Sequence, residues 1–153
     1  MDAKEFIKHV LIDEIKDISE RHPYISFGLI CLGIELIGKC DLTKYQDWHK
    51  INPDKAFKSG MKLMESVDSR YANVDLKDEL RNGFAHTLLP KSKIAMGELK
   101  NGVVHFSRGK NGQIILASEV LYQDFAKACQ MIIDKEFPSD DKMNKPFLYV
   151  GPI

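Results

Sequence analysis

A strongly apolar segment between residues 24 and 40 constrains the fold more than any other feature of the chain. Its sequence, YISFGLICLGIELIGKC, places apolar residues around most of a helix and contains one carboxylate, Glu35. The apolar run is shorter than the roughly 20 residues that cross a bilayer, and Glu35 interrupts it. Gly28, Gly33 and Gly38 recur at intervals that allow another backbone to approach closely. We therefore expect a buried central helix.

Helical periodicity predicts four more helices around this one. Their expected starts are an Asp2 N-cap, the pair Asn52-Pro53, Asp75 and a Ser118 N-cap, and prolines at 23, 90 and 138 mark three of the ends. Each helix has apolar residues spaced for one buried face. These residues are Ile7, Leu11, Ile15 and Ile18; Phe57, Met61, Met64 and Val67; Leu76, Leu80, Phe84 and Leu88; and Leu121, Phe125, Ala128 and Ile132.

Between the last two predicted helices the pattern changes from helical to alternating. The segments KIAMGEL, VVHFS and QIILA are separated by Asn101-Gly102 and by RGKNG, which are turn-forming sequences. We expect a mainly α fold: a bundle of four or five helices with a small antiparallel β-hairpin, or a three-stranded insert, at about residues 93–117. A length of 153 residues suits one domain, taken as 1–137, followed by an extended tail at 138–153.

Charge and cysteine usage narrow the class of protein. Twenty-two basic residues balance 22 acidic ones, which argues against a disordered acidic chain and against a strongly basic nucleic-acid coat. Cys31, Cys40 and Cys129 have no CxxC spacing, and the remaining histidines have no ligand spacing, so we expect no disulfide framework, no metal and no cofactor. The N-terminal segment has acidic residues among its apolar ones, whereas a secretory signal peptide has an uninterrupted apolar stretch. We therefore expect a cytoplasmic protein that does not associate with membranes.

One dense polar group lies on the predicted helix that begins at Asp75. The run RNGFAH contains Arg81, Asn82 and His86. At about 100° per residue, Asn82 and His86 lie one turn apart on the same face, and the long Arg81 side chain can reach that surface. A guanidinium is a charged fork for phosphate oxygens, and an imidazole exchanges protons near neutral pH. These residue types suit phosphodiester chemistry.

This run resembles the signature of the HEPN domains, which are all-α bundles that include many metal-independent endoribonucleases. The apolar helix with an embedded Glu, GLICLGIELIGKC, followed by a helix bearing Arg-Asn and His, matches the order in that family. The resemblance covers roughly the first helix to His86. The hairpin and the final helix are outside the diagnostic pattern.

The resemblance implies a role for each motif residue. Arg81 would bind the scissile phosphate, His86 would act on the 2′-hydroxyl or the leaving 5′-oxygen, and Asn82 would help to position them. The products would be a 2′,3′-cyclic phosphate and a 5′-hydroxyl end, without a metal. A homodimer sharing its sites across the interface is implied, and so is a role as a toxin or in phage defence, with an antitoxin-like partner.

Two other interpretations of the motif stay open. The same bundle can be a non-catalytic dimerisation module that binds a nucleotide or RNA without turnover. Alternatively, Arg81 and His86 make only surface contacts at a helix end, where a histidine interacts with free carbonyls.

Glu35 is the second candidate residue, because burying a carboxylate requires a cation or hydrogen-bond donors. Its natural partner is Arg81, and Glu35 would orient the Arg81 side chain without contacting the substrate itself. The alternative partner is Lys39, one helical turn away at the surface.

A basic segment follows the motif. Between residues 87 and 112 five cations accompany a single acid, Glu98, although the whole chain is neutral. An RNA backbone would bind there; the competing interpretation is a solvated hairpin whose lysines discourage pairing with other chains. The cations are Lys91, Lys93, Lys100, Arg108 and Lys110, of which Lys91, Lys93, Arg108 and Lys110 are the candidates for RNA contact.

Overall fold

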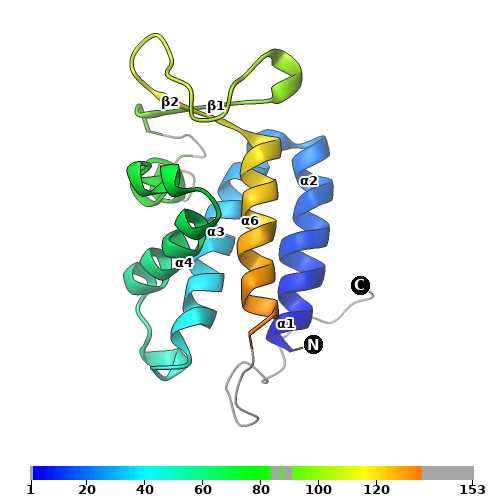
Figure 1. Ribbon diagram of the computed structural model, residues 1–153, viewed down its shortest axis with the longest axis vertical. Coiled ribbons are helices and arrows are strands. Elements are labelled where there is room, and N and C mark those ends of the chain that lie inside the picture. The colour runs from blue at the N-terminus through cyan, green and yellow to red at the C-terminus, as the bar shows by residue number, and fades with distance from the viewer. Residues whose placement is uncertain (1, 84–86, 88–90, 136–153) are drawn as a thin grey trace.

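The structure is a computed structural model that describes residues 2–83, 87 and 91–135 (Figure 1). The mainly α class expected from the sequence is confirmed, because helices make up most of the described chain and a two-stranded sheet accompanies them. Phe84, His86, Leu88 and the tail at 138–153 lie outside the described residues.

The N-terminal helix runs as one rod in three consecutive pieces: α1 Ala3–Phe6, η1 Ile7–Glu14 and α2 Ile15–Arg21. The expected cap at Asp2 is confirmed as a capping box, in which Asp2 accepts from the Glu5 N–H and Glu5 accepts from the Asp2 N–H. The middle piece, η1, is a π-helix. The rod still buries Ile7, Leu11 and Ile15.

Helix α3, Pro23–Leu42, is the central helix that its composition predicts. It packs against α2, α4 (Pro53–Val67) and α6 (Ser118–Ile133), and in Figure 1 it lies behind α6. Two glycines make the packing on α4 possible: a Cβ on Gly38 would lie 1.9 Å from the Ala56 carbonyl oxygen, and one on Gly60 would lie 2.0 Å from that of Ile34. Within the described residues, no helix has both the length and the apolar character needed to cross a membrane.

The starts of α4 and α6 show where sequence signals hold and where they fail. Asn52 caps α4 by accepting from the Lys55 N–H, as expected. The prediction that Ser118 caps α6 is wrong. Ala117 occupies the cap position, and Ser118 is the first helical residue, with its hydroxyl donating to Glu119. The predicted apolar face of α6 is buried, with Leu121, Phe125, Ala128 and Ile132 at 0% exposure.

The insert before α6 differs from the expected antiparallel hairpin. Its strands, β1 Ile94–Gly97 and β2 Ile114–Ala117, pair in parallel, with Ile94 opposite Ile114. The predicted turn at Asn101-Gly102 ends a 3₁₀ helix, η5 Leu99–Asn101, with Gly102 at φ 77°. The chain therefore does not reverse directly beside β1. The VVHFS segment is not a strand, although the backbone N–H of Phe106 donates to the Ile115 carbonyl.

The helix with the RNGFAH motif is π-helical in its described part, η4 Lys77–Asn82. The Asp75 carboxylate accepts from the Asp78 N–H at its start, and Leu76 and Leu80 are fully buried. Because a π-helix closes i→i+5 hydrogen bonds, the assumed 100° per residue does not apply to this segment. The expected alignment of Asn82 with His86 depends on residues 84–86, which lie outside the described residues.

Candidate functional site

Arg81 and Glu35 form an ion pair between η4 and α3. The Arg81 Nε donates to Glu35 Oε2 at 3.1 Å, and Nη2 lies 3.0 Å from the same oxygen. The Arg81 Nη1 donates to Asn82 Oδ1 at 3.1 Å. The partner predicted for Glu35 is confirmed, and the site joins residues that are 46 positions apart in the chain.

The pair is half-buried and holds the guanidinium in one orientation. The Arg81 and Glu35 side chains are 28% and 24% exposed. The contacts use Nε, Nη1 and Nη2 once each. A guanidinium has five N–H groups, so the described residues leave N–H groups on Nη1 and Nη2 that an oxyanion can accept from.

The alternative partner of Glu35 is engaged elsewhere. The Lys39 ammonium lies over the Trp48 ring, 4.5 Å from its centroid, which is a cation–π geometry. Trp48 belongs to a short 3₁₀ helix, η2 Trp48–Lys50, that packs on α3. Glu35 is therefore directed to Arg81 and not along its own helix surface.

Polar contacts on the other sides of η4 fix how the helix sits. Lys77 pairs with Asp54 of α4 at 2.7 Å, and Asp78 pairs with Lys91 at 2.5 Å. The hydrogen bond from Lys91 holds the pKa of Asp78 below its usual value. These pairs are exposed and contribute little energy each, but together with Arg81 they orient a short helix.

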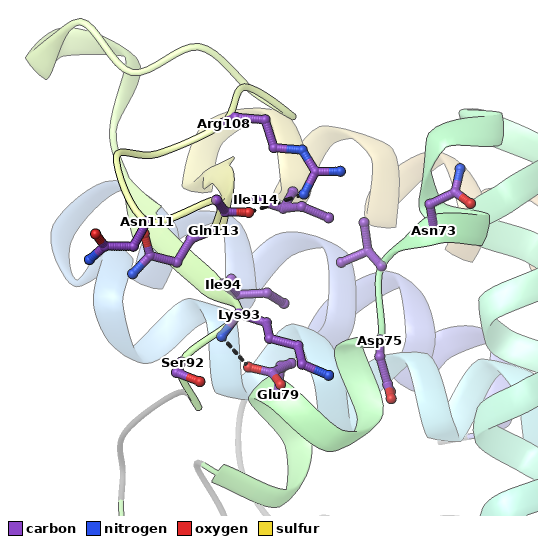
Figure 2. Close-up of a pocket in the computed structure, with 12 residues that line it drawn as sticks. Asn73, Asp75, Glu79, Ser92, Lys93, Ile94, Arg108, Asn111, Gln113 and Ile114 are labelled. Carbon is purple, nitrogen blue, oxygen red and sulfur yellow. Dashed lines mark hydrogen bonds between the residues drawn. The ribbon is translucent and has the colours of Figure 1, made fainter.

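A polar pocket of about 560 Å³ lies on the side of η4 that faces the sheet (Figure 2). We call it the η4–β1 pocket. Figure 2 shows Arg108 and Lys93 entering from opposite sides, with Ile94 and Ile114 between them. Twelve residues line it: Asn73, Val74, Asp75, Glu79, Ser92, Lys93, Ile94, Arg108, Asn111, Gly112, Gln113 and Ile114.

Of the cations proposed for RNA contact, the structure brings two together. Lys93 and Arg108 share the η4–β1 pocket, and Arg108 donates to the Gly112 carbonyl at 3.1 Å. Lys91 is paired with Asp78, and Lys110 is exposed and does not line that pocket. Glu79 was not among the expected site residues, and it is 4% exposed in a short helix of charged residues. No sequence signal separates it from its exposed neighbour Asp78.

A second polar cluster was also missed. The Tyr71 hydroxyl donates to Asp124 Oδ2 at 3.0 Å and lies 3.2 Å from His105 Nε2. His105 Nδ1 accepts from the Ala117 N–H, so Nε2 carries the proton of the neutral ring. Burial lowers the pKa of His105. His105 therefore joins the insert to Tyr71 and to the backbone of Ala117, directly before α6.

The described residues hold no group of three or more His, Cys, Asp or Glu side chains that could bind a metal ion. The three cysteines are buried, and no disulfide joins them. Burial raises the pKa of Cys31 to about 12, so its thiol stays protonated and unreactive at neutral pH.

No protein-family model, curated protein or solved structure matches this chain.

Proposed function

We propose that the protein is a metal-independent endoribonuclease that cleaves RNA through attack of the 2′-hydroxyl on the adjacent phosphate. The proposal starts from the similarity of RNGFAH to the HEPN signature. In it Arg81 binds the scissile phosphate, Asn82 positions Arg81, and His86 transfers protons. His86 lies outside the described residues, so its role rests on the motif.

The observation that carries the proposal is the oriented Arg81 guanidinium. Glu35 and Asn82 hold it through three nitrogen atoms, at 3.0–3.1 Å, in a half-buried position. The partly buried Glu35 carboxylate needs a cation, and its ion pair fixes the direction of the Arg81 guanidinium. A fixed guanidinium with N–H groups to spare suits the charge that develops on a phosphorane.

The proposed chemistry needs a nucleophile, a proton acceptor and charge stabilisation. RNA supplies the nucleophile, its own 2′-hydroxyl, so no activated water is required. His86 would accept the hydroxyl proton or protonate the leaving 5′-oxygen. Arg81 would stabilise the negative charge on the non-bridging phosphate oxygens.

Cleavage of single-stranded RNA in EDTA by purified variants tests the proposal. Arg81→Ala and His86→Ala should each lower the rate by about 10²–10³. Arg70→Ala is the matched control, because Arg70 also pairs with a carboxylate, Asp68 at 2.6 Å, but lies outside the motif. Cleavage that persists in both motif variants would show that the activity comes from a contaminant.

A non-catalytic dimerisation and RNA-binding module is the second candidate, and an apolar groove favours it. The groove has a volume of about 310 Å³ and lies between the N-terminal rod and α3. Leu32 in it is 55% exposed. An exposed large apolar side chain that adjoins other apolar side chains is typical of an assembly surface. The lining includes Val10, Ile18, Leu29, Leu32 and Leu36.

A homodimer is part of both candidates. Two glycines of α3 pack inside the protein, because Gly33 lies against Phe125 and Gly38 against α4. The groove at Leu32 is the better candidate for the dimer interface. RNA binding without cleavage, lost in Arg81→Ala, would favour the binding module over the enzyme.

A further inference from the structure

The η4–β1 pocket contains a buried carboxylate that is short of hydrogen-bond donors. Glu79 is 4% exposed, and its Oε2 accepts from the Lys93 N–H at 2.8 Å. No other described residue donates to its carboxylate. An ionised carboxylate has about four acceptor sites, and leaving them unfilled away from water is costly. The pocket is therefore built to receive donors.

The cations of the pocket are also available. Among the described residues, neither Lys93 nor Arg108 forms an ion pair with a carboxylate. In Figure 2 the Lys93 side chain lies beside Glu79, and Arg108 lies on the opposite side of the pocket. A simple cation would be repelled by Lys93 and Arg108, and a simple anion would be repelled by Glu79. The fitting ligand has hydrogen-bond donors at one end and an anionic group at the other.

The volume and lining of the pocket indicate the size and the chemical character of this ligand. Ile94 and Ile114 provide an apolar surface between Arg108 and Lys93, and Val74 also lines the pocket. The volume of about 560 Å³ is that of a site for a molecule larger than an amino acid. A planar ring against the aliphatic side chains, joined to a phosphate, meets all of these conditions.

We propose that the η4–β1 pocket binds a guanine nucleotide. Guanine is the RNA base with two adjacent donors, N1–H and the 2-amino group, on its Watson–Crick edge, and Glu79 would accept from both. Adenine and cytosine each have a single donor with an acceptor atom beside it on this edge. A carboxylate would repel that acceptor. Arg108, on the opposite side of the pocket from Glu79, would bind the phosphate.

The identity of the guanine follows from the position of Glu79. Glu79 and Arg81 belong to the same helix, η4, with Glu79 facing the sheet and Arg81 facing α3. The pocket would thus take a guanine of the same RNA strand whose phosphate Arg81 binds. Only this choice of RNA over free nucleotide rests on the proposed function.

Calorimetric titration of the wild-type protein with guanosine, inosine and adenosine 5′-monophosphates tests the proposal without any mutation. Inosine lacks the 2-amino group, so inosine monophosphate should bind about tenfold more weakly than guanosine monophosphate. Adenosine monophosphate should bind about 100-fold more weakly. Equal affinity for the guanine and adenine nucleotides, or no guanosine monophosphate binding at millimolar concentration, would overturn the proposal.

Variants then assign the preference to residues. Glu79→Gln keeps an oxygen for the Lys93 N–H but replaces the other with a donor, so the preference for guanine should be lost. Glu119→Gln is the matched control, because Glu119 also accepts a backbone N–H, from Leu99 at 3.1 Å, outside the pocket. Arg108→Gln should weaken binding of guanosine monophosphate more than that of guanosine. A guanine preference that survives in Glu79→Gln would refute the role of this carboxylate.

A further titration, with RNA, distinguishes RNA from free nucleotide as the ligand. It also tests the nuclease proposal and the guanine-pocket proposal separately. His86→Ala protein is titrated with a pentanucleotide that contains one guanine, and with the same RNA carrying inosine. Tighter binding of the guanine RNA than of guanosine monophosphate identifies RNA as the source, and the reverse identifies free nucleotide. Guanine binding in a protein that never cleaves RNA would refute the nuclease alone. Cleavage without any guanine preference would refute the pocket alone.

Discussion

The close contact between α3 and α4 allows a stability prediction to be worked out in detail. Gly38→Ala adds a Cβ that would lie 1.9 Å from the Ala56 carbonyl oxygen and 2.3 Å from the Gly60 nitrogen. Cβ contacts essentially never fall below 3.0 Å, so the helices must separate by about 1.1 Å, the difference between 3.0 and 1.9 Å. Both contacts are backbone atoms, so no side chain can rotate away.

The energetic cost follows from this separation. A gap of 0.5–1 Å removes roughly a quarter to a half of the dispersion energy of each affected contact. Overpacking a core typically costs about 1–3 kcal/mol, and the backbone clash places this variant near the upper value. Replacing glycine with alanine inside a helix returns about 1 kcal/mol of helix propensity. We therefore expect Gly38→Ala to lower the free energy of unfolding by about 2 kcal/mol.

Urea unfolding followed by circular dichroism measures this effect. With a slope of about 2 kcal/mol per molar urea, the midpoint should fall by about 1 M at unchanged slope. Gly109→Ala is the control, because its nearest contact is the flexible end of Gln113, 3.1 Å away. A Gly38→Ala protein as stable as the wild type would refute the inference that backbone contact fixes the position of α3, and of Glu35 with it.

Three further predictions concern pH, the ion pair and assembly. Burial lowers the pKa of His105 below its usual value of 6.5, so as the pH falls the unfolded chain binds the proton before the folded chain does. The free energy of unfolding should therefore be highest above about pH 6.5 and decrease at lower pH. In a His105→Gln variant it should change less between about pH 7 and 5. Glu35→Gln should lower RNA cleavage about tenfold, while Glu20→Gln, on an exposed surface, should leave it unchanged. Light scattering should show a dimer that Leu32→Glu dissociates, whereas a monomeric wild-type protein at high micromolar concentration would contradict a shared interface.

The helices and the Arg81–Glu35 pair were predictable from the sequence because local and pairwise rules determine them. Apolar spacing marked Ile7, Leu121 and Phe125 as core residues, and they are buried. A carboxylate in an apolar helix must find a cation, and the motif supplied Arg81 as the partner for Glu35.

The direction of the β-strands was not predictable by the same rules. An Asn-Gly pair fits a hairpin turn and also fits a helix end with a left-handed glycine, and Gly102 takes the second role. The path from β1 to β2 depends on tertiary contacts, such as the His105 bond to the Ala117 N–H, that no local pattern encodes. The π-helical winding of η4 and the burial of Glu79 likewise depend on neighbouring elements.

The most direct test of the proposed reaction uses an RNA in which one nucleotide at the cleavage site carries a 2′-deoxyribose. In EDTA, the wild-type protein should cleave the all-ribose RNA to 2′,3′-cyclic phosphate and 5′-hydroxyl ends, and it should not cleave the substituted bond, because the nucleophile is absent. Cleavage of the substituted bond at the same rate, or products with a 5′-phosphate, would contradict attack by the 2′-hydroxyl.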